Sequence, residues 1–280
     1  MEAYEKRGYL DQGFRLFHLT DIPREEFEFH YHDFDKLIIF LSGQVTYMIE
    51  GRTYELKPYD IVSVPQHMIH RPLIDQGVPY DRIIIYFSPD FLTHYKTSDY
   101  DLSTCIMRAR ETHSEVLRIP HLSRSVLFQS IKNLEQACQE DGYANELRCR
   151  LLFLEFMIQL NRNVLNEDII YLSTVSGNRQ IQQILAYLND HLAERLSIEQ
   201  LSREFHMSRY HMMRLFKQET GCTIGDYLNS KRLMLAKELL LQDYPLTEIC
   251  YMSGFSGYTA FARAYKKTYG KTPRNDRPAR

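Results

Sequence analysis

The stretch LSIEQLSREFHMSRYHMMRLFKQETG, from Leu196 to Gly221, decides the fold of the C-terminal part of the chain. A second stretch, PLTEICYMSGFSGYTAFARAYKKTYG, from Pro245 to Gly270, repeats its pattern. Apolar residues recur at helical spacing in both stretches, first over a short segment and then over a longer one. Matching positions are 48 residues apart before the turn and 49 apart after it. Each copy therefore predicts a short helix, a tight turn and a second helix.

Each turn carries a serine, Ser208 in the first copy and Ser256 in the second. A serine hydroxyl accepts a hydrogen bond from the backbone at a helix start, so we expect both serines to cap the helix that follows. The apolar stripe of each second helix fixes which residues face its core. These are Met212, Leu215 and Phe216 in the first copy, and Phe261, Ala264 and Tyr265 in the second.

The face opposite each stripe is basic, with hydrogen-bonding and apolar side chains between the charges. A helix that enters the major groove of DNA needs this mixture. A solvated surface is the ordinary explanation for one such face, but two faces in register favour DNA. The candidate DNA-binding residues are Arg209, Tyr210, Met213, Arg214 and Lys217 in the first copy, and Tyr258, Thr259, Ala262, Arg263 and Lys266 in the second.

Charge separates the two parts of the chain. From Ser176 onward there are 16 Lys and Arg against 10 Asp and Glu, a net charge of +6. The preceding residues hold 18 against 26, a net charge of −8, and the whole chain is at −2. Only the C-terminal part is predicted to bind phosphates.

The segment GFSGYTAFARAYKKTYGKTP, from Gly254 to Pro273, resembles the signature of the AraC/XylS family of transcription regulators, and the first copy resembles that family's first helix-turn-helix. The resemblance covers about 100 residues and implies two helix-turn-helix units on double-stranded DNA. Gly257 departs from the family pattern, and a glycine near a helix start is expected to loosen the second reading helix. Between the copies, Ile224 to Leu241 predicts a long helix that begins after Thr223 and spaces the reading helices along the duplex.

Residues 14–88 read as short strands broken by turns. Val45, Tyr47 and Ile49 share one face of a strand, which a Glu50-Gly51 turn follows. The order of strands resembles the cupin-like barrel at the N-terminus of many AraC-family regulators. The chain is thus expected to be an α+β multidomain protein with an N-terminal cupin-like β-barrel, dimerisation helices and a C-terminal all-α domain.

Two segments resemble the cupin motifs, HYHDFDKLIIFLSG from His30 and VPQHMIHRP from Val64. In cupin enzymes, histidines and a glutamate at these places hold a metal. Here Lys36 stands where the glutamate is expected, and a cation there opposes a divalent ion, so we predict neither a metal nor another cofactor. The same positions suit a small polar ligand in a barrel with apolar walls. The candidate ligand-binding residues are His30, His32, Lys36, Tyr47 and His70, and the alternative for each is a side chain facing solvent or capping a loop.

Two helices are expected after the barrel. In residues 123–139 the apolar stripe is Leu127, Ile131, Leu134 and Cys138, whereas residues 144–161 are apolar nearly all round. In the resembled family such helices commonly form the dimer contact, so a homodimer through residues 123–161 is expected; full coverage within one chain is the alternative. Residues 163–178 break the pattern and read as a linker.

The five cysteines show no CxxC spacing and read as reduced, packed thiols. The N-terminus lacks a hydrophobic signal core, and no apolar run is long enough to span a membrane, so a cytoplasmic location away from the membrane is expected. The predicted domains are a sensing and dimerisation domain at 1–165, a linker at 166–178 and a DNA-binding domain at 179–280.

The predicted function is a sequence-specific transcription regulator, an activator, whose barrel binds a small-molecule effector such as a sugar and whose partners include RNA polymerase. One alternative is a metal-dependent cupin enzyme with an accessory DNA-binding domain. The chain contains no GxSxG, Walker or HExxH motif, so no catalytic residue is predicted. The other alternative is a constitutive regulator whose barrel serves only assembly.

Overall fold

The computed structural model describes residues 5–6, 10, 13–22, 27–66, 68–112, 114–174 and 178–277. The chain forms two compact units, one from Glu5 to Ser176 and the other containing Gly177 to Arg280. Each unit has its own buried core. Within the expected linker, residues 175–177 lie outside the described part of the chain.

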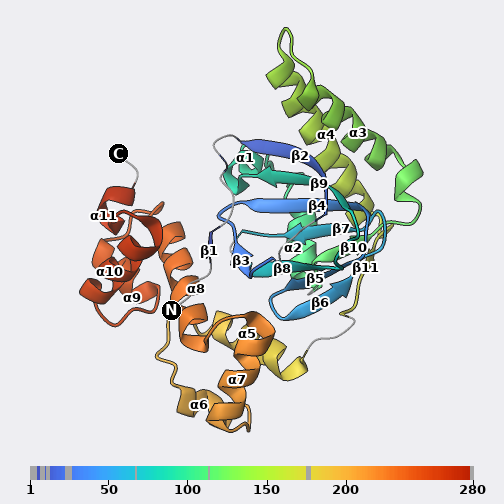
Figure 1. The fold of residues 1–280 in the computed structure, drawn as a ribbon. Helices are drawn as coiled ribbons and strands as arrows, with labels where there is room; N and C mark the ends of the chain where they lie inside the picture. Colours follow the sequence, from blue (N-terminus) through green and yellow to red (C-terminus); the bar gives the residue numbers. More distant parts are fainter. Residues whose placement is uncertain are drawn as a thin grey trace. The chain divides into compact units, whose positions relative to one another are not determined.

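The first unit is built on two sheets (Figure 1). One has the strand order β1-β3-β8-β5-β6 and the other β11-β10-β7-β4-β9-β2. All pairings are antiparallel except that of β1 with β3. The strands are β1 (Glu5–Lys6), β2 (Phe14–Asp21), β3 (His30–Tyr31), β4 (Asp35–Ser42), β5 (Val45–Ile49), β6 (Arg52–Glu55), β7 (Ile61–Val64), β8 (His70–Ile74), β9 (Tyr80–Phe87), β10 (Val116–Arg118) and β11 (Ile170–Tyr171).

The longer sheet is buried on both faces at β4. Ile38 and Phe40 join the core between the sheets, whereas Leu37 and Ile39 join the core under the helices. Successive side chains of a strand point to opposite faces, so a strand covered on both sides must be apolar throughout. Val45, Tyr47 and Ile49 lie in the first of these cores, as predicted, and Glu50 and Gly51 form the predicted turn with φ of 46° and 71°.

The helices of this unit are α1 (Pro89–Thr93), α2 (Thr104–Glu111), η1 (Leu122–Arg124), α3 (Val126–Gln139) and α4 (Asn145–Leu165). Figure 1 shows α3 and α4 side by side as a hairpin. Leu127, Ile131 and Leu134 pack into the core beneath the sheet, as expected. The prediction for Cys138 was wrong: Ala137 is buried, whereas Cys138 is exposed because the last turn of α3 borders a cavity.

The expected linker at 166–178 contains a strand that the sequence did not predict. Helix α4 continues to Leu165, and within 166–178 the strand β11 pairs with β10, Leu117 opposite Tyr171 and Arg118 opposite Ile170. Polar and turn-forming residues surround this short strand, so the sequence pattern did not predict it. Its backbone is held by a partner about 50 residues earlier in the chain.

The second unit is all helical, with α5 (Arg179–Asp190), α6 (Ile198–Glu204), α7 (Arg209–Thr220), α8 (Ile224–Leu239), α9 (Leu246–Met252), α10 (Tyr258–Tyr269) and α11 (Pro273–Asp276). The predicted helix-turn-helix units are α6–α7 and α9–α10. Ser208 caps α7 by accepting from His211 N, and Thr223 caps α8 by accepting from Asp226 N. Gly221 and Gly270 end the two reading helices in the left-handed region, at φ of 80° and 76°.

The expected cap at Ser256 is wrong. The N-cap position of α10 is Gly257, which has extended backbone and makes no side-chain cap. Gly257 is the residue added in the second turn, so it moves Ser256 one position too far from the helix. Since Gly257 precedes the helix, it does not interrupt α10.

Helix α8 joins the two copies through two cores. Its first half buries Ile224, Tyr227 and Leu228, and the Tyr227 ring meets that of Phe216 from α7 at 5.7 Å. Its second half shares a core with α9 and α10 that contains Leu233, Ala236, Leu239, Ile249, Cys250, Phe261 and Tyr265. One rigid rod of about 24 Å, at 1.5 Å per residue, therefore supports both reading helices.

Candidate functional site

The first reading helix, α7, has a buried and a free face. Met212 and Phe216 are fully buried, which directs the opposite side chains outward. Tyr210 is 74% exposed and Met213 is 43% exposed. Arg209, Arg214 and Lys217 are exposed too, and Arg209 forms an ion pair of 2.6 Å with Glu199 of α6.

The second reading helix, α10, follows the same scheme. Phe261 and Tyr265 are fully buried. Ala262 is half-buried, so it offers a methyl group rather than a reaching side chain. The exposed residues of this face are Tyr258, Thr259, Arg263 and Lys266.

These two faces carry side chains of the kinds that contact DNA in helix-turn-helix proteins. Arginine donates two hydrogen bonds to a guanine edge, Thr and Ala methyl groups contact a thymine methyl, and Lys or Tyr holds phosphates. Arg214 and Arg263 occupy matching places, 49 residues apart, in the middle of their helices. Neither forms an ion pair within the described residues. Both guanidinium groups are therefore available to a ligand.

A contact not foreseen from the sequence fixes the second helix-turn-helix copy against the segment between α5 and α6. Arg232 of α8 donates from Nε to Leu192 O at 2.8 Å and from Nη2 to Glu194 O at 2.6 Å. Gly254, in the turn between α9 and α10, lies against the same Leu192 carbonyl: a Cβ there would be 2.1 Å from the oxygen and 2.7 Å from Arg232 Nε. We call Leu192, Arg232 and Gly254 the hub.

Comparing the two copies of the repeat would have indicated the close contact at Gly254. Gly254 matches His206 of the first copy, and both residues have positive φ, 85° and 50°. His206 shows that this turn tolerates a side chain. The glycine at 254 is therefore required by the close approach of Leu192 and Arg232, and not by the turn alone.

In the first unit, the structure brings all five candidate ligand residues together. His30 of β3 pairs in register with His70 of β8, and the rings of His30, His32 and His70 lie 4.4 to 5.1 Å apart. Lys36 Nζ is 3.5 Å from His70 Nε2, and Tyr47 stacks on His70 at 6.0 Å. All five are buried. We call this group the buried cluster.

Lys36 enters the cluster because of strand periodicity. It shares the inner face of β4 with Ile38 and Phe40, so its amine lies among apolar core residues. Burial, followed by the nearby positive charge of Arg82, lowers the pKa of Lys36 to about 7. Within the described residues no carboxylate pairs with Lys36. Burial, followed by Lys36 and the neighbouring histidines, also depresses the pKa of His70 well below its usual value.

The cluster's hydrogen bonds determine what it can bind. His30 Nδ1 donates to Glu28 O and His70 Nδ1 donates to Met68 O, both at 2.8 Å. The Nε2 atoms of both rings are therefore acceptors, and that of His70 already faces the Lys36 amine at 3.5 Å. This combination fits a molecule that carries both hydroxyl donors and acceptors.

The three histidines also satisfy part of a metal's requirements. Their ligand atoms lie within 4.8 Å of one another, and backbone carbonyls orient two of the rings, as in many metal sites. In the described residues no carboxylate joins them, and the position expected for one holds Lys36. As an ammonium Lys36 repels a divalent ion, so the donor set fits a metal only when this amine is neutral.

Sequence reasoning missed the aromatic wall of the cluster. Phe34 stacks on His32 at 4.7 Å, and the ring of Tyr86 lies 4.4 Å from Phe34 and 5.9 Å from Lys36 Nζ. Phe34 stands inside the first cupin-like segment, and Tyr86 comes from β9. Only the pairing of β4 with β9, Lys36 opposite Tyr86, reveals the second of these.

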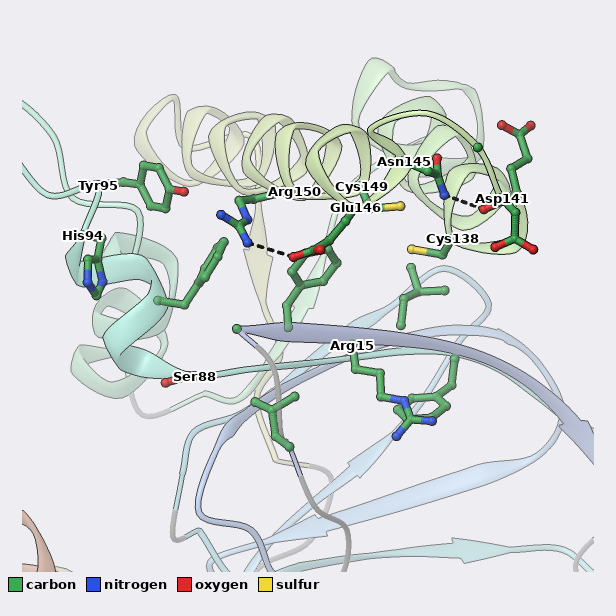
Figure 2. Close-up of a pocket in the computed structure, with 18 residues that line it drawn as sticks. Arg15, Ser88, His94, Tyr95, Cys138, Asp141, Asn145, Glu146, Cys149 and Arg150 are labelled. Carbon is green, nitrogen blue, oxygen red and sulfur yellow. Dashed lines mark hydrogen bonds and ion pairs between the residues drawn. The ribbon is translucent and has the colours of Figure 1, made fainter. Parts of the chain in front are cut away.

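A cavity of about 1060 Å³ lies outside the buried cluster, between β2, α1 and the α3–α4 hairpin (Figure 2). It mixes aromatic and charged groups, among them Phe14, Phe91, Arg15 and Arg150. This cavity has room for a ligand, whereas the buried amine and imidazole groups lie together in the cluster. Burying Lys36 without a carboxylate is costly, and proteins keep such groups mainly where they act.

Lys36→Met is expected to stabilise the protein, and more at low pH. The pKa of Lys36 is about 7 folded against 10.5 unfolded, so the folded state binds fewer protons between these values. The penalty is complete below about pH 7 and fades as the pH rises toward 10.5. At ~1.4 kcal/mol per pKa unit its upper limit is roughly 5 kcal/mol.

Urea denaturation of both proteins near pH ~6 and ~9 measures this difference. Lys57→Met, at an exposed lysine of the same unit, is the control and should change little at either pH. An equal loss of stability for Lys36→Met at both pH values would show that the amine is not buried as a costly cation.

Among the described residues, no helix combines the length and apolar character needed to cross a membrane. A family model described as an AraC-like ligand binding domain matches residues 16–157, and one described as a helix-turn-helix domain matches residues 201–278. The chain is 26% identical over 262 residues to "HTH-type transcriptional activator RhaS" of Enterobacter sp. (strain 638), covering 92% of this chain and 90% of that protein.

Solved structures are also similar. A Listeria innocua protein of unknown function is 39% identical, covers 35% of this chain and 93% of its own, and has a TM-score of 0.34. ToxT of Vibrio cholerae is 16% identical, covers 94% of this chain and 97% of its own, and has a TM-score of 0.36.

Proposed function

This chain belongs to the AraC family, and from that premise we propose that it is a transcriptional activator that binds specific DNA and responds to a small polar effector. The observation that carries the proposal is the duplicated helix-turn-helix, whose two reading helices expose matching basic faces. All ten candidate DNA-binding residues lie outside the core, and Ala262 alone among them is half-buried.

A genome-wide footprint of the full chain tests the DNA-binding part. We expect protected sites containing two short motifs about one helical turn apart, since α8 holds two reading helices on one rod. Protection without any shared motif would contradict sequence-specific reading. The genes beside the sites then narrow the search for the effector.

We place the effector in the buried cluster of His30, His32, Lys36, Tyr47 and His70. The cluster combines histidine acceptors with the Lys36 donor, a mixture that suits a hydroxyl-rich molecule such as a sugar. If the effector binds DNA-competent and incompetent states unequally, it shifts their populations, and DNA must change effector affinity by the same factor. Lys36→Met should keep DNA binding and abolish the response to the effector.

The two alternative functions have weaker support. A metal-dependent enzyme needs a complete ligand set, and Lys36 stands where cupin enzymes place a carboxylate. The named relative is a transcriptional activator. If the domain served only assembly, a buried lysine without a carboxylate would lower its stability without any gain in function. Near-stoichiometric metal in purified protein would revive the first alternative.

We also propose that the protein is a homodimer through residues 123–161. Helix α4 buries Phe153, Phe156, Met157 and Leu160 but leaves Leu147 54% exposed and Leu151 59% exposed. Leu154 and Ile158 on the same helix are only partly covered. An apolar stripe left in water is typical of a surface that a partner covers.

Leu151→Glu is expected to convert the dimer to a monomer, since a carboxylate in an apolar interface loses its hydration. Sedimentation of the full chain measures the change, with the exposed Glu155→Gln of the same helix as the control. Unchanged mass for Leu151→Glu would move the interface elsewhere.

The remaining proposals follow from activation at DNA. An activator acts on RNA polymerase, so we include this enzyme among the partners. We place the protein in the cytoplasm with the DNA it reads. We propose domain limits at 1–165, 166–178 and 179–280, with β11 as a strand that the linker adds to the sensing domain.

A further inference from the structure

Two cysteines meet where the α3–α4 hairpin closes. Cys138 lies at the end of α3 and Cys149 near the start of α4, and both line the same cavity. Figure 2 shows their sulfur atoms directed toward each other from the two helices. The other three cysteines, Cys105, Cys222 and Cys250, are buried elsewhere.

Side chains hold this turn in place. Asn145 Nδ2 donates to Ala137 O at 2.8 Å and also to Glu140 O, and Arg148 forms an ion pair with Glu140. These contacts tie the end of α3 to the first turn of α4. They therefore hold together the two helix ends that carry the facing sulfur atoms.

The pair is also accessible. Both cysteines line the cavity of about 1060 Å³, and Cys138 is exposed whereas Cys149 is buried. A small solute in the cavity therefore reaches Cys138 first and finds Cys149 directly behind it. An exposed thiol with a second thiol in contact is the usual arrangement of a reactive and a resolving cysteine.

We propose that Cys138 and Cys149 form a reversible dithiol–disulfide site that reacts with hydroperoxides. The Cys138 sulfur attacks the terminal peroxide oxygen, the O–O bond breaks, and Cys138 becomes a sulfenic acid. Its thiol proton leaves with the other oxygen as an alcohol, or as water when the oxidant is hydrogen peroxide. The Cys149 sulfur then attacks the Cys138 sulfur, the S–O bond breaks, and water leaves with the Cys149 proton. Two thiols and one hydroperoxide thus give a disulfide, an alcohol and water, and a dithiol reductant reverses the change.

The environment sets the rate of this chemistry. Partial burial, and then the neighbouring Cys149, raise the pKa of the Cys138 thiol to about 12. Thiolate is therefore scarce at neutral pH, and the reaction is slow. Cys149 then removes the sulfenic acid that does form, before further, irreversible oxidation.

The disulfide would act on a defined part of α4. Cys149 lies between Leu147 and Leu151 in sequence but on the buried side of the helix. Oxidation would thus link α3 covalently to the part of α4 that carries the exposed Leu147 and Leu151.

The test uses the reduced full-length protein and hydrogen peroxide. After exposure the protein is unfolded, its thiols are alkylated and counted, and cross-linked peptides are mapped. Of the five free thiols, we expect three to remain, with Cys138 joined to Cys149, and a dithiol reductant should restore all five.

Three variants separate this site from general oxidation. Cys222→Ser should still form the bond, and Cys138→Ser should not. In Cys149→Ser, Cys138 should proceed to sulfinic acid. Five thiols after treatment, a bond between other cysteines, or bonds only between two chains would overturn the proposal.

Discussion

Gly254→Ala is expected to destabilise the DNA-binding unit by ~3 kcal/mol or more. The new Cβ would lie 2.1 Å from the Leu192 carbonyl oxygen, and φ of 85° is unfavourable for any residue with a side chain. Relief requires the α9–α10 turn to move away from Leu192 and Arg232. The second reading helix then loses its fixed position relative to the first, so specific DNA binding should fall together with stability.

Gly257→Ala provides a matched control three residues away. No atom lies within 4 Å of a Cβ at this position, and its backbone is extended. Alanine is a poor N-cap, so a loss of less than ~1 kcal/mol is expected. Thermal and urea unfolding of the two variants measure the difference. Similar small losses for both would show that the hub is not a close contact in solution.

Arg214→Ala and Arg263→Ala should each weaken binding to the specific site by ~1–3 kcal/mol, roughly 5- to 150-fold. Both side chains are exposed at matching places on the two reading helices, and a guanidinium that donates twice to guanine has no substitute in alanine. Because the two contacts lie on separate helices, the double variant should lose about the sum of the two effects. Titrations on specific and random duplexes at one fixed salt concentration give these values.

Lys217→Ala is the control for phosphate binding. It should weaken specific and random binding alike and reduce the salt dependence of both. If the arginine variants behave in this same way, Arg214 and Arg263 hold phosphates and the bases are read by other residues.

The twin helix-turn-helix was predicted accurately because its information is local. Apolar spacing, capping hydroxyls and the terminal glycines Gly221 and Gly270 each act within one or two helical turns. The same local reading failed at Ser256, where one inserted residue moved the hydroxyl away from the helix start. It failed at Cys138 because the helical period continues whether or not another element covers the last turn.

The buried cluster shows an intermediate case. The cupin-like segments supplied four of the five residues, whose grouping the resemblance implied, and Tyr47 came from the strand between these segments. The lowered pKa of Lys36 and its lack of a carboxylate partner depend on the packing of β4 between other strands. Tyr86 and Phe34 were missed for the same reason.

The sequence by itself determined the two-part organisation, the duplicated reading motif, its basic faces and the family of this protein. Tertiary structure alone decided that Gly254 meets Leu192 and Arg232, that Cys138 meets Cys149, and that β11 extends the sheet. Periodicity and capping are properties of neighbouring residues, so they can be read along the chain. Contacts between distant segments depend on how whole helices and strands pack, and a residue's type does not specify which distant atom it will meet.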